Sequence, residues 1–566
     1  MKLSGLLGCL AAVAAFCACS EKEAPGGANG SEDSGRFLAV EMANPVTKKA
    51  LADDYETGSD AEDKVYSLRL YFFDSAGQAA AVSPGATVNY VDCPEVGDPK
   101  GADAAEKKLQ AVVMVSTGTA SISSLVAVAN YEIAGLGTEA LSLAELCRKI
   151  GAYDSPQREN GTDPHFLMTS SSYAGAEGLV VVTEIKPSHL CETEELAKEN
   201  PIVVHIERVV AKTRLRTAWT GGVVTKGGVT YNGQTYVAVA LKDHSGQEIK
   251  SGGNQVYALF TAWDVTGTVD NSYLFKKVNT PAAWNLGWIW NNSDFFRSYW
   301  AMNPDRLTLG YVRYSDIAQE VGPKGAAYCL ENAADNFSDG TKSSYDPAAQ
   351  TSNRTQAIIA AVLVTVDGNN QATPVDLARW AGMDYTEAGA KTAMLNTVST
   401  DIYVKEGSGF VSIKPEHVRF VTATAAGMAD DSSEESPRYL SCLQLTDAAK
   451  SLQFYASASD AATLTGSQVD GMLKEIPGAK VWKSGLTYYY TDIRHLGAAE
   501  TKGLYGVVRN HIYDVNINSV VGLGTPVYDP DEVIVPQKPD KDETYIAAEV
   551  KILAWRVVDN DTDLEW

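Results

Sequence analysis

The chain has 566 residues, of which 45% are apolar, and a formal net charge of −24. This length exceeds what one hydrophobic core supports and the apolar content is ordinary for globular proteins, so the composition predicts two or more folded domains. The acidic balance opposes binding to nucleic acid and to anionic lipid, because both would repel the chain.

A targeting segment begins the chain. Lys2 supplies a basic start, residues 3–16 are apolar, and small residues follow. The apolar run is short for a membrane span. Its end has the form of a bacterial lipobox, which predicts removal of residues 1–18 and lipidation of Cys19. Cys17 is the weaker candidate for lipidation, because Phe16 before it is not the small residue that a lipobox has. The alternative to a lipobox is a plain secretory signal. A lipid chain would hold the precursor on the outer membrane.

A predicted strand and a basic loop come next. Residues 21–35 are rich in Glu, Gly, Ser and Asp, which predicts a flexible spacer. The strand starts at Phe37 and places three apolar side chains, Leu38, Val40 and Met42, on one face. The following polar loop contains Lys48-Lys49-Ala50, and a protease can cut such a loop. A cut between Lys49 and Ala50 would remove the strand together with the lipid anchor. The alternative is that the two lysines are merely solvated.

Short apolar or alternating runs, separated by turn residues, predict a mainly β body. In the first half the predicted strands are Val65 to Phe73, Leu109 to Ser116, Ser124 to Ala129 and Gly178 to Ile185. In the second half they are Tyr236 to Leu241, Val256 to Val265, Ile358 to Thr365, Val481 to Tyr490 and His511 to Val521. Residues 202–216 are predicted to carry the domain boundary. Helices are predicted over Leu141 to Ile150, Asp376 to Thr397 and Thr446 to Tyr455.

An aromatic-rich stretch runs from Trp284 to Trp300. Such rings can stack on sugars, although aromatic residues near turns more often fill a core or an interface. The five cysteines that follow Cys19 have neither the number nor the spacing of a disulfide framework or a zinc site, and we predict that they are buried apolar fillers. They are Cys93, Cys147, Cys191, Cys329 and Cys442.

The chain lacks the usual sequence motifs of catalysis. HExxH, GxSxG and P-loop motifs are absent, so neither an enzyme nor a cofactor is predicted. Residues 559–563 resemble the start of a calcium loop, but no Gly follows and the final Glu ligand is missing, so no metal is predicted.

The last predicted strand, from Tyr545 to Trp555, repeats the first. Its apolar residues alternate, and Ile546, Ala548, Val550, Ile552 and Ala554 share one face. It follows a linker rich in Pro, Asp and Lys, so we predict a tethered strand that does not fold into a hairpin. Residues 545–550 match residues 37–42 position by position. Strands with one side-chain pattern can fill one groove, so the last strand of one copy is predicted to replace the first strand of the next. Two ordinary edge strands with a coincidental match are the alternative.

These features resemble the fimbrillins of Bacteroidales, and most closely the shaft subunit of the short (minor) fimbria. The resemblance is carried by the lipobox, the first strand with its basic loop, and the blocks at residues 328–332, 488–490, 507–513 and 548–557. It implies an all-β protein of two transthyretin-like β-sandwich domains with short helical insertions and a C-terminal donor strand. It also implies export as a lipoprotein, cleavage by a trypsin-like surface protease, and donor-strand exchange with other copies or related subunits. One departure is that the family's cut commonly follows Arg, whereas Lys49 stands here.

The predicted organisation can be given by residue numbers. Residues 1–18 are the signal peptide, 19–49 the spacer and removable strand, 50–208 the N-terminal sandwich, 209–528 the C-terminal sandwich, 529–544 the linker, and 545–566 the donor strand with an acidic tail. The predicted function is an adhesive fimbrial subunit. Because the chain has a tail for the next groove, we expect a shaft or stalk position. The alternative is a surface glycan-binding lipoprotein that stays anchored through Cys19.

Overall fold

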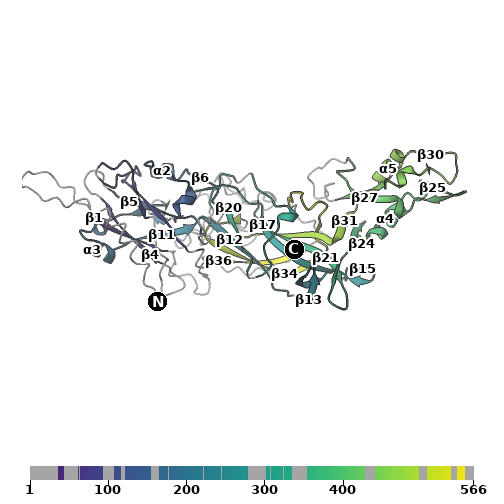
Figure 1. Cartoon of the computed structure of the whole chain (residues 1–566), viewed down its shortest axis with the longest axis horizontal. Helices are drawn as coiled ribbons and strands as arrows, with labels where there is room; N and C mark the ends of the chain where they lie inside the picture. Colours follow the sequence, from purple (N-terminus) through teal and green to yellow (C-terminus); the bar gives the residue numbers. More distant parts are fainter. Residues whose placement is uncertain are drawn as a thin grey trace, which may run out of the picture.

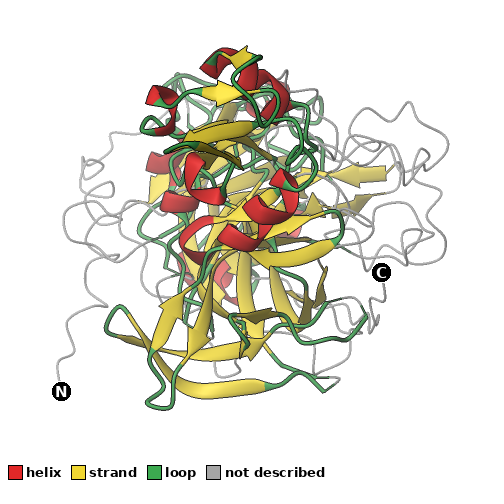
Figure 2. Ribbon diagram, turned by 90° about the vertical axis from the view of Figure 1, so that its right-hand side faces the viewer, coloured by secondary structure: helices red, strands yellow, loops and turns green. Residues whose placement is uncertain are grey.

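The computed structural model describes residues 36–43, 62, 64–93, 108–115, 122–153, 165–277, 301–333, 354–427, 440–495, 506–536 and 545–554, apart from residues 84, 172, 176–177, 221, 244, 306–307 and 323. The described chain consists mainly of β-strands with a few short helices (Figure 2), so the predicted all-β fold is confirmed. The molecule is elongated, with β1 towards one end and α4 and α5 at the other (Figure 1). The number of transthyretin-like domains and their boundaries stay predictions.

The first sheet has the strand order β3-β2-β5-β7-β11-β1-β4, and β10 also pairs with β5. Leu38 of β1, Val113 of β4 and Leu70 of β2 belong to one buried cluster although β2 and β1 lie far apart in the sheet, so the sheet curls around this core. The strands are β1 (Arg36–Ala43), β2 (Leu68–Phe73), β3 (Tyr90–Cys93), β4 (Lys108–Val115), β5 (Ser124–Ala129), β7 (Met168–Ser170), β10 (Thr183–Glu184) and β11 (Ile202–Arg208).

Two further sheets form the middle of the molecule. A four-stranded sheet has the order β19-β12-β34-β36, and a seven-stranded sheet has the order β13-β14-β17-β21-β32-β35 with β22 beside β21. One core cluster takes Val515 from the first of these sheets and Trp263 and Ile359 from the second, so the two sheets pack face to face. The smaller sheet contains β12 (Val210–Thr217), β19 (Ala327–Leu330), β34 (His511–Val521) and β36 (Tyr545–Ala554). The larger contains β13 (Thr225–Tyr231), β14 (Gln234–Ala240), β17 (Tyr257–Thr266), β21 (Gln356–Val366), β22 (Ala372–Pro374), β32 (Leu486–Asp492) and β35 (Thr525–Pro526).

The first sheet continues into the middle of the molecule almost without a break. β11 and β12 are separated only by Val209, which is fully buried. The boundary predicted within residues 202–216 therefore coincides with a direct passage from one sheet to the next. Such a short connection leaves little freedom for the two parts to move against each other.

Residues between Asp376 and Ser484 form an inserted module at the far end of the molecule (Figure 1). It has its own buried cluster, which includes Met394, Phe454 and Leu473. Its elements are β23 (Leu377–Trp380), β24 (Met383–Thr386), α4 (Glu387–Leu395), β25 (Tyr403–Glu406), β26 (Gly409–Ser412), β27 (Val418–Thr422), β28 (Ser441–Leu445), β29 (Phe454–Tyr455), β30 (Thr463–Leu464), α5 (Gly466–Lys474) and β31 (Lys480–Trp482).

Small elements complete the described chain. The short paired strands are β6 (Ile150–Gly151) with β18 (Ser272–Tyr273), β8 (Tyr173–Gly175) with β9 (Gly178–Val180), β15 (Lys250–Ser251) with β16 (Asn254–Gln255), and β20 (Asn332–Ala333) with β33 (Gly506–Val507). Two short helices are α2 (Leu143–Leu146) and α3 (Glu194–Glu199).

The predicted helix over Asp376 to Thr397 is wrong in its first half. Residues 377–386 form the hairpin of β23 and β24, because Ala381 and Gly382 adopt positive φ angles of 48° and 76° and turn the chain tightly. α4 begins only after Thr386, whose side chain accepts the N–H of Gly389 and caps the helix. The helix predicted over Thr446 to Tyr455 is also wrong, since only Ala449–Ser451 form a 3₁₀ turn before β29.

The prediction of buried cysteines is right in part. Cys329 and Cys442 are buried, whereas Cys147 and Cys191 are partly exposed. The Cys93 side chain lies outside the described residues. No disulfide occurs among the cysteines that the structure describes.

Candidate slot for an exchanged strand

β1 lies between two strands that come from distant parts of the chain. It runs antiparallel to β4 from Arg36, opposite Val115, to Ala43, opposite Lys108, and parallel to β11 from Val40, opposite Ile202. Withdrawal of a strand that is paired on both edges leaves two rows of backbone N–H and C=O groups without partners. The position of β1 is therefore the candidate slot for an exchanged strand.

The inward face of β1 is part of the core. Leu38 and Val40 are fully buried and pack in the cluster that contains Val113 and Ile202. At roughly 1.5–3 kcal/mol for each fully buried aliphatic side chain, these two residues contribute about 3–6 kcal/mol. Phe37 is partly exposed, and the Met42 side chain lies outside the described residues. The slot therefore selects apolar residues at alternate positions.

The start of β1 is held by the chain that precedes α3. Phe37 and Cys191 exchange two backbone hydrogen bonds of 2.8 and 2.9 Å. Next to them Arg36 forms an ion pair of 2.8 Å with Glu192, and this guanidinium holds the pKa of Glu192 below its ordinary range. The carboxylate is exposed, so the ion pair adds little to stability. The backbone pairing is the stronger restraint at this end of the slot.

The C-terminal strand lies elsewhere in the same molecule. β36 runs antiparallel to β34 at the edge of the four-stranded sheet, with Val550 opposite Val515 and Ala548 opposite Ile517. The sequence predicts a tethered strand outside a hairpin; in the structure residues 522–544 separate it from β34, and it pairs with β34 of the same molecule. The physical reason is that β34 would otherwise be an unpaired edge, and a strand tethered nearby satisfies its backbone groups. Both predicted strands exist, and they occupy separate places.

Part of the predicted linker is packed against the body. The Ile534 N–H donates to the Val312 carbonyl at 2.9 Å, and the Ser315 N–H donates to the Pro530 carbonyl at 3.0 Å. Ile534 itself is 8% exposed. Residues 530 and 534 of the predicted linker are therefore held against the body.

Glu62 fixes the chain that follows the predicted cleavage loop. Its side chain, 3% exposed, accepts a hydrogen bond from the Tyr328 hydroxyl at 2.6 Å and forms an ion pair of 2.7 Å with Lys212. Its carbonyl accepts from Arg208 Nε at 2.8 Å. These partners belong to β19, β12 and β11, so Glu62 is bound to both parts of the molecule. This anchor does not depend on β1.

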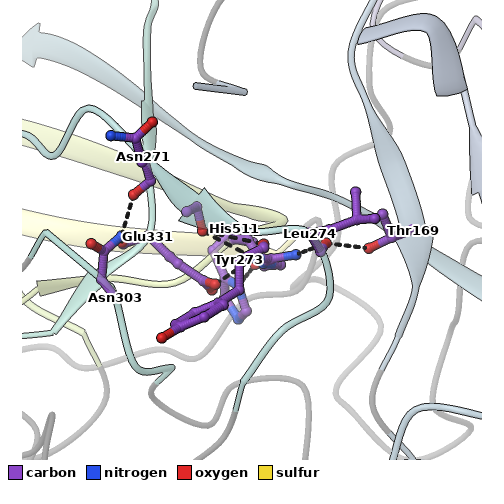
Figure 3. A network of polar contacts seen from close by, with 9 residues as sticks. Thr169, Asn271, Tyr273, Leu274, Asn303, Glu331 and His511 are labelled. Carbon is purple, nitrogen blue, oxygen red and sulfur yellow. Dashed lines mark hydrogen bonds and ion pairs between the residues drawn. The ribbon is translucent and has the colours of Figure 1, made fainter. Parts of the chain in front are cut away.

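A network of buried polar contacts, in which Thr169, Leu274 and Glu331 are labelled in Figure 3, joins the first sheet to the middle of the molecule. The side chains of Arg509 and Glu331 are 0% and 1% exposed and form an ion pair of 2.5 Å. Arg509 also donates to the carbonyls of Tyr273 at 2.7 Å and Leu274 at 3.0 Å. The Leu274 carbonyl in turn accepts from the Thr169 hydroxyl of β7 at 3.2 Å. The network therefore connects a strand of the first sheet with the segment before β34.

The sequence pattern alone assigns no role to these polar residues. Arg509 and Asn510 stand directly before an alternating apolar strand, and this change from charged to apolar residues was the available signal. Asn510 adopts a φ of 59°, and its side-chain oxygen accepts from the Arg208 N–H at 3.2 Å. The block at residues 507–513 thus forms much of the junction between the two parts.

Other predicted sites lie outside the described residues: Cys19, Lys49, Ala50 and the stretch from Trp284 to Trp300. Within the described part of the chain, no group of three or more His, Cys, Asp and Glu side chains could hold a metal ion. No helix in that part has the length and apolar character needed to cross a membrane.

The C-terminal region matches a known family. Residues 480–561 match the family described as "Major fimbrial subunit protein type IV, Fimbrillin, C-terminal", and this range contains β32, β34 and β36. The resemblance to the fimbrillins stated from the sequence is therefore confirmed over this range. The narrower assignment to the shaft of the minor fimbria stays a prediction. A search of curated protein sequences finds no match to the chain.

Solved structures of fimbrial proteins are similar to this chain at low sequence identity. The fimbrilin (fimA) of Porphyromonas gingivalis W83 has 13% identity and a TM-score of 0.36, over 92% of this chain and 99% of that one. The tip fimbrial protein Mfa3 of Porphyromonas gingivalis has 11% identity and a TM-score of 0.29, over 91% and 100%. A fimbrial assembly protein of Parabacteroides distasonis ATCC 8503 has 11% identity and a TM-score of 0.26, over 59% and 82%. The family conclusion rests on residues 480–561.

Proposed function

We propose that this chain is a structural subunit of a cell-surface fimbria that supports adhesion and polymerises by strand exchange. The precursor is exported as a lipoprotein held on the outer membrane through Cys19. A trypsin-like surface protease then cuts after Lys49 and removes β1 together with the lipid anchor. Residues 545–554 of one copy, or of a related subunit, fill the slot that β1 leaves in the next. A shaft or stalk position follows from the presence of this tail.

One observation carries the proposal. β1 is paired on both edges and buries Leu38 and Val40, and residues 545–550 repeat its side-chain pattern. In the repeated pattern Ile546 stands for Leu38 and Ala548 for Val40. The tail therefore offers apolar residues at the alternate positions that the slot buries.

The exchange also has a favourable balance of strand pairings. β36 has β34 as its one partner strand and lies at a sheet edge, whereas the slot has a partner strand on each side. Moving the tail from the edge into the slot therefore replaces one ladder with two. The backbone entropy of ordering a free tail, about 1–2 kcal/mol per residue, is already largely lost while β36 is paired. We expect the exchanged state to be slow to reverse, because both ladders must break together.

Truncation of the tail tests the proposal. A chain ending at Asp540 retains the slot and the body but lacks the strand, so after trypsin treatment it should stay a folded monomer. Electron microscopy and gel filtration compare it with the full-length chain, which should form fibres. Fibres of normal length from the truncated chain would exclude this function.

The site of cleavage is tested separately. Changing Lys48 and Lys49 to Ala should preserve the lipidated precursor on the membrane, because the loop no longer contains a basic residue for the protease. The retained size of the precursor on a gel, together with the N-terminal sequence of any product, gives the result. Maturation at the normal rate would place the cut elsewhere.

A further inference from the structure

On the outward face of β1, the side chain of Ala39 is completely shielded from solvent. Leu38 and Val40 point into the core, so Ala39 between them points to the opposite face of the sheet. Ala39 is nevertheless fully buried, whereas Met114 of β4 and Val203 of β11 are 52% and 41% exposed. The cover over Ala39 is therefore local.

The cover is α3. This helix contacts both β1 and β4, and Ala197 is its one buried residue, so it packs on the sheet through a small side chain. The chain reaches α3 from Cys191, which pairs with Phe37, and continues into β11 on the same side of β1. We call residues 191–199 the arch. Ala39 is already without exposed surface, so this close-packed position leaves room for only a small residue.

We propose that the arch fixes the register of the incoming strand and requires Ala547 of the second copy beneath α3. The proposal rests on the strand exchange proposed above and names the residue that determines its specificity. In this register Tyr545 replaces Phe37 opposite Cys191, and Ile546, Ala548 and Val550 point inward.

The side-chain alternation alone does not define this register. A shift by one residue would bury Glu549 in the core, so alternation excludes odd shifts. A shift by two residues keeps apolar side chains inside, but it places Tyr545 or Glu549 beneath α3. On the outward face of residues 545–553, Ala547 is the one small residue among Tyr, Glu, Lys and Leu. The arch therefore excludes the even shifts that the core permits.

Polymerisation of variants tests the requirement for a small residue. Ala547→Leu should slow fibre formation about tenfold or more, since a well-packed site does not accept three additional carbons. Ala547→Ser, which stays small, and Glu549→Leu, which adds bulk at a position that is partly exposed in β1, should polymerise like the parent. The double variant Ala547→Leu/Glu549→Ala moves the small residue by two positions and should recover polymerisation in a shifted register. Circular dichroism and gel filtration check that each free subunit is folded.

A disulfide reports the register directly. Residues that exchange two backbone hydrogen bonds have Cα atoms about 5.5 Å apart, within the range of a disulfide. Tyr545→Cys should therefore crosslink to Cys191 of the next copy and give a ladder of oligomers on a non-reducing gel. Ile546→Cys points inward and should not, and adding Cys191→Ser should abolish the ladder. Phe37→Cys in the uncleaved precursor should form the same bond within one chain.

The outcomes distinguish a failure of the register proposed here from a failure of strand exchange itself. If Ala547→Leu polymerises at the parental rate, or if Ile546→Cys crosslinks instead of Tyr545→Cys, the arch does not set the register and this inference is wrong. Strand exchange would still stand if the chain ending at Asp540 fails to polymerise. If that truncated chain forms fibres, the proposed function itself fails.

Discussion

At the scale of single residues, the slot depends on a few fully buried side chains in a strand that is proposed to be temporary. Leu38 contributes to the core only while β1 is present. Its burial should therefore contribute to the stability of the precursor and contribute nothing to the stability of the assembled fibre.

Leu38→Ala should lower the free energy of unfolding of the precursor by about 2–5 kcal/mol, because it removes buried methyl groups and leaves a cavity. Leu452→Ala, at a position that is 40% exposed, is the matched control and should change it by less than about 0.5 kcal/mol. Urea denaturation followed by tryptophan fluorescence measures both. Equal losses of unfolding free energy in the two variants would show that Leu38 is not buried in the core. The stability of fibres built from cleaved subunits should be unchanged by Leu38→Ala, because cleavage removes this residue.

Burial also controls the reactivity of a cysteine. It raises the pKa of the Cys147 thiol to about 11, although Lys277 acts in the opposite direction. At pH 8 roughly one thiol in a thousand is then ionised, and the thiolate is the reactive form. Alkylation by iodoacetamide, followed by mass spectrometry, should be slow at pH 8 and should accelerate about tenfold for each unit of pH up to about 11. Alkylation at the rate of the denatured chain would contradict this.

At the scale of elements, the two ends of the inserted module leave the body side by side. Its ends meet where the Ser484 N–H donates to Asp376 at 2.6 Å and where β23 pairs with β31. The module buries its own cluster and lies at the end of the molecule far from β1 (Figure 1). A unit with its own core and adjacent ends can be gained or lost without a change in the surrounding sheets.

Replacing residues 378–481 with a short Gly-Ser linker should therefore leave the other sheets folded and the slot intact. Leu377 and Trp482 are kept because they belong to the core of the middle sheets. Circular dichroism, gel filtration and the fibre assay measure the result. The surface around Tyr528, which packs against the module, becomes exposed, so Tyr528→Ser is combined with the deletion. Aggregation of this variant would mean that the module is part of the main fold.

At the scale of the whole molecule, buried polar contacts hold the first sheet to the rest. Removing one partner of a buried ion pair leaves the other charge without compensation, whereas replacing both can be nearly neutral. The Arg509–Glu331 pair is of this kind, while Arg36–Glu192 is exposed.

Arg509→Met should cost about 3–5 kcal/mol of stability, because Glu331 then stays buried and unpaired. The double variant Arg509→Met/Glu331→Leu should regain most of this loss. Arg36→Met, at the exposed pair, should cost about 1 kcal/mol or less. Denaturant unfolding of the uncleaved precursor, which retains Arg36, compares the three variants. A double variant that is no more stable than Arg509→Met would show that the carbonyl contacts of Arg509, and not the charge pair, account for its contribution.

The sequence predicted best those elements whose pattern is local. Ser124–Ala129 and His511–Val521 are strands with the predicted bounds, because a run of apolar or alternating residues depends on few neighbours. The likeness of residues 37–42 and 545–550 indicated a shared slot, but it could not indicate β4 and β11 as its walls. Strand partners distant in sequence leave no local signal. Glu62 and Arg509 were missed for a related reason, since a charged residue looks solvated until its partners are known.

The direct passage from β11 to β12 has a consequence for a filament under tension. A pull on an inserted tail is transferred to β11, passes through Val209 into β12, crosses to β34, and leaves along that copy's own tail. Two of these steps, from the inserted tail to β11 and from β12 to β34, cross ladders of hydrogen bonds that lie across the direction of pulling, so many bonds must yield at once. The step at Val209 is covalent, and the inserted module lies outside this path and would bear almost none of the load.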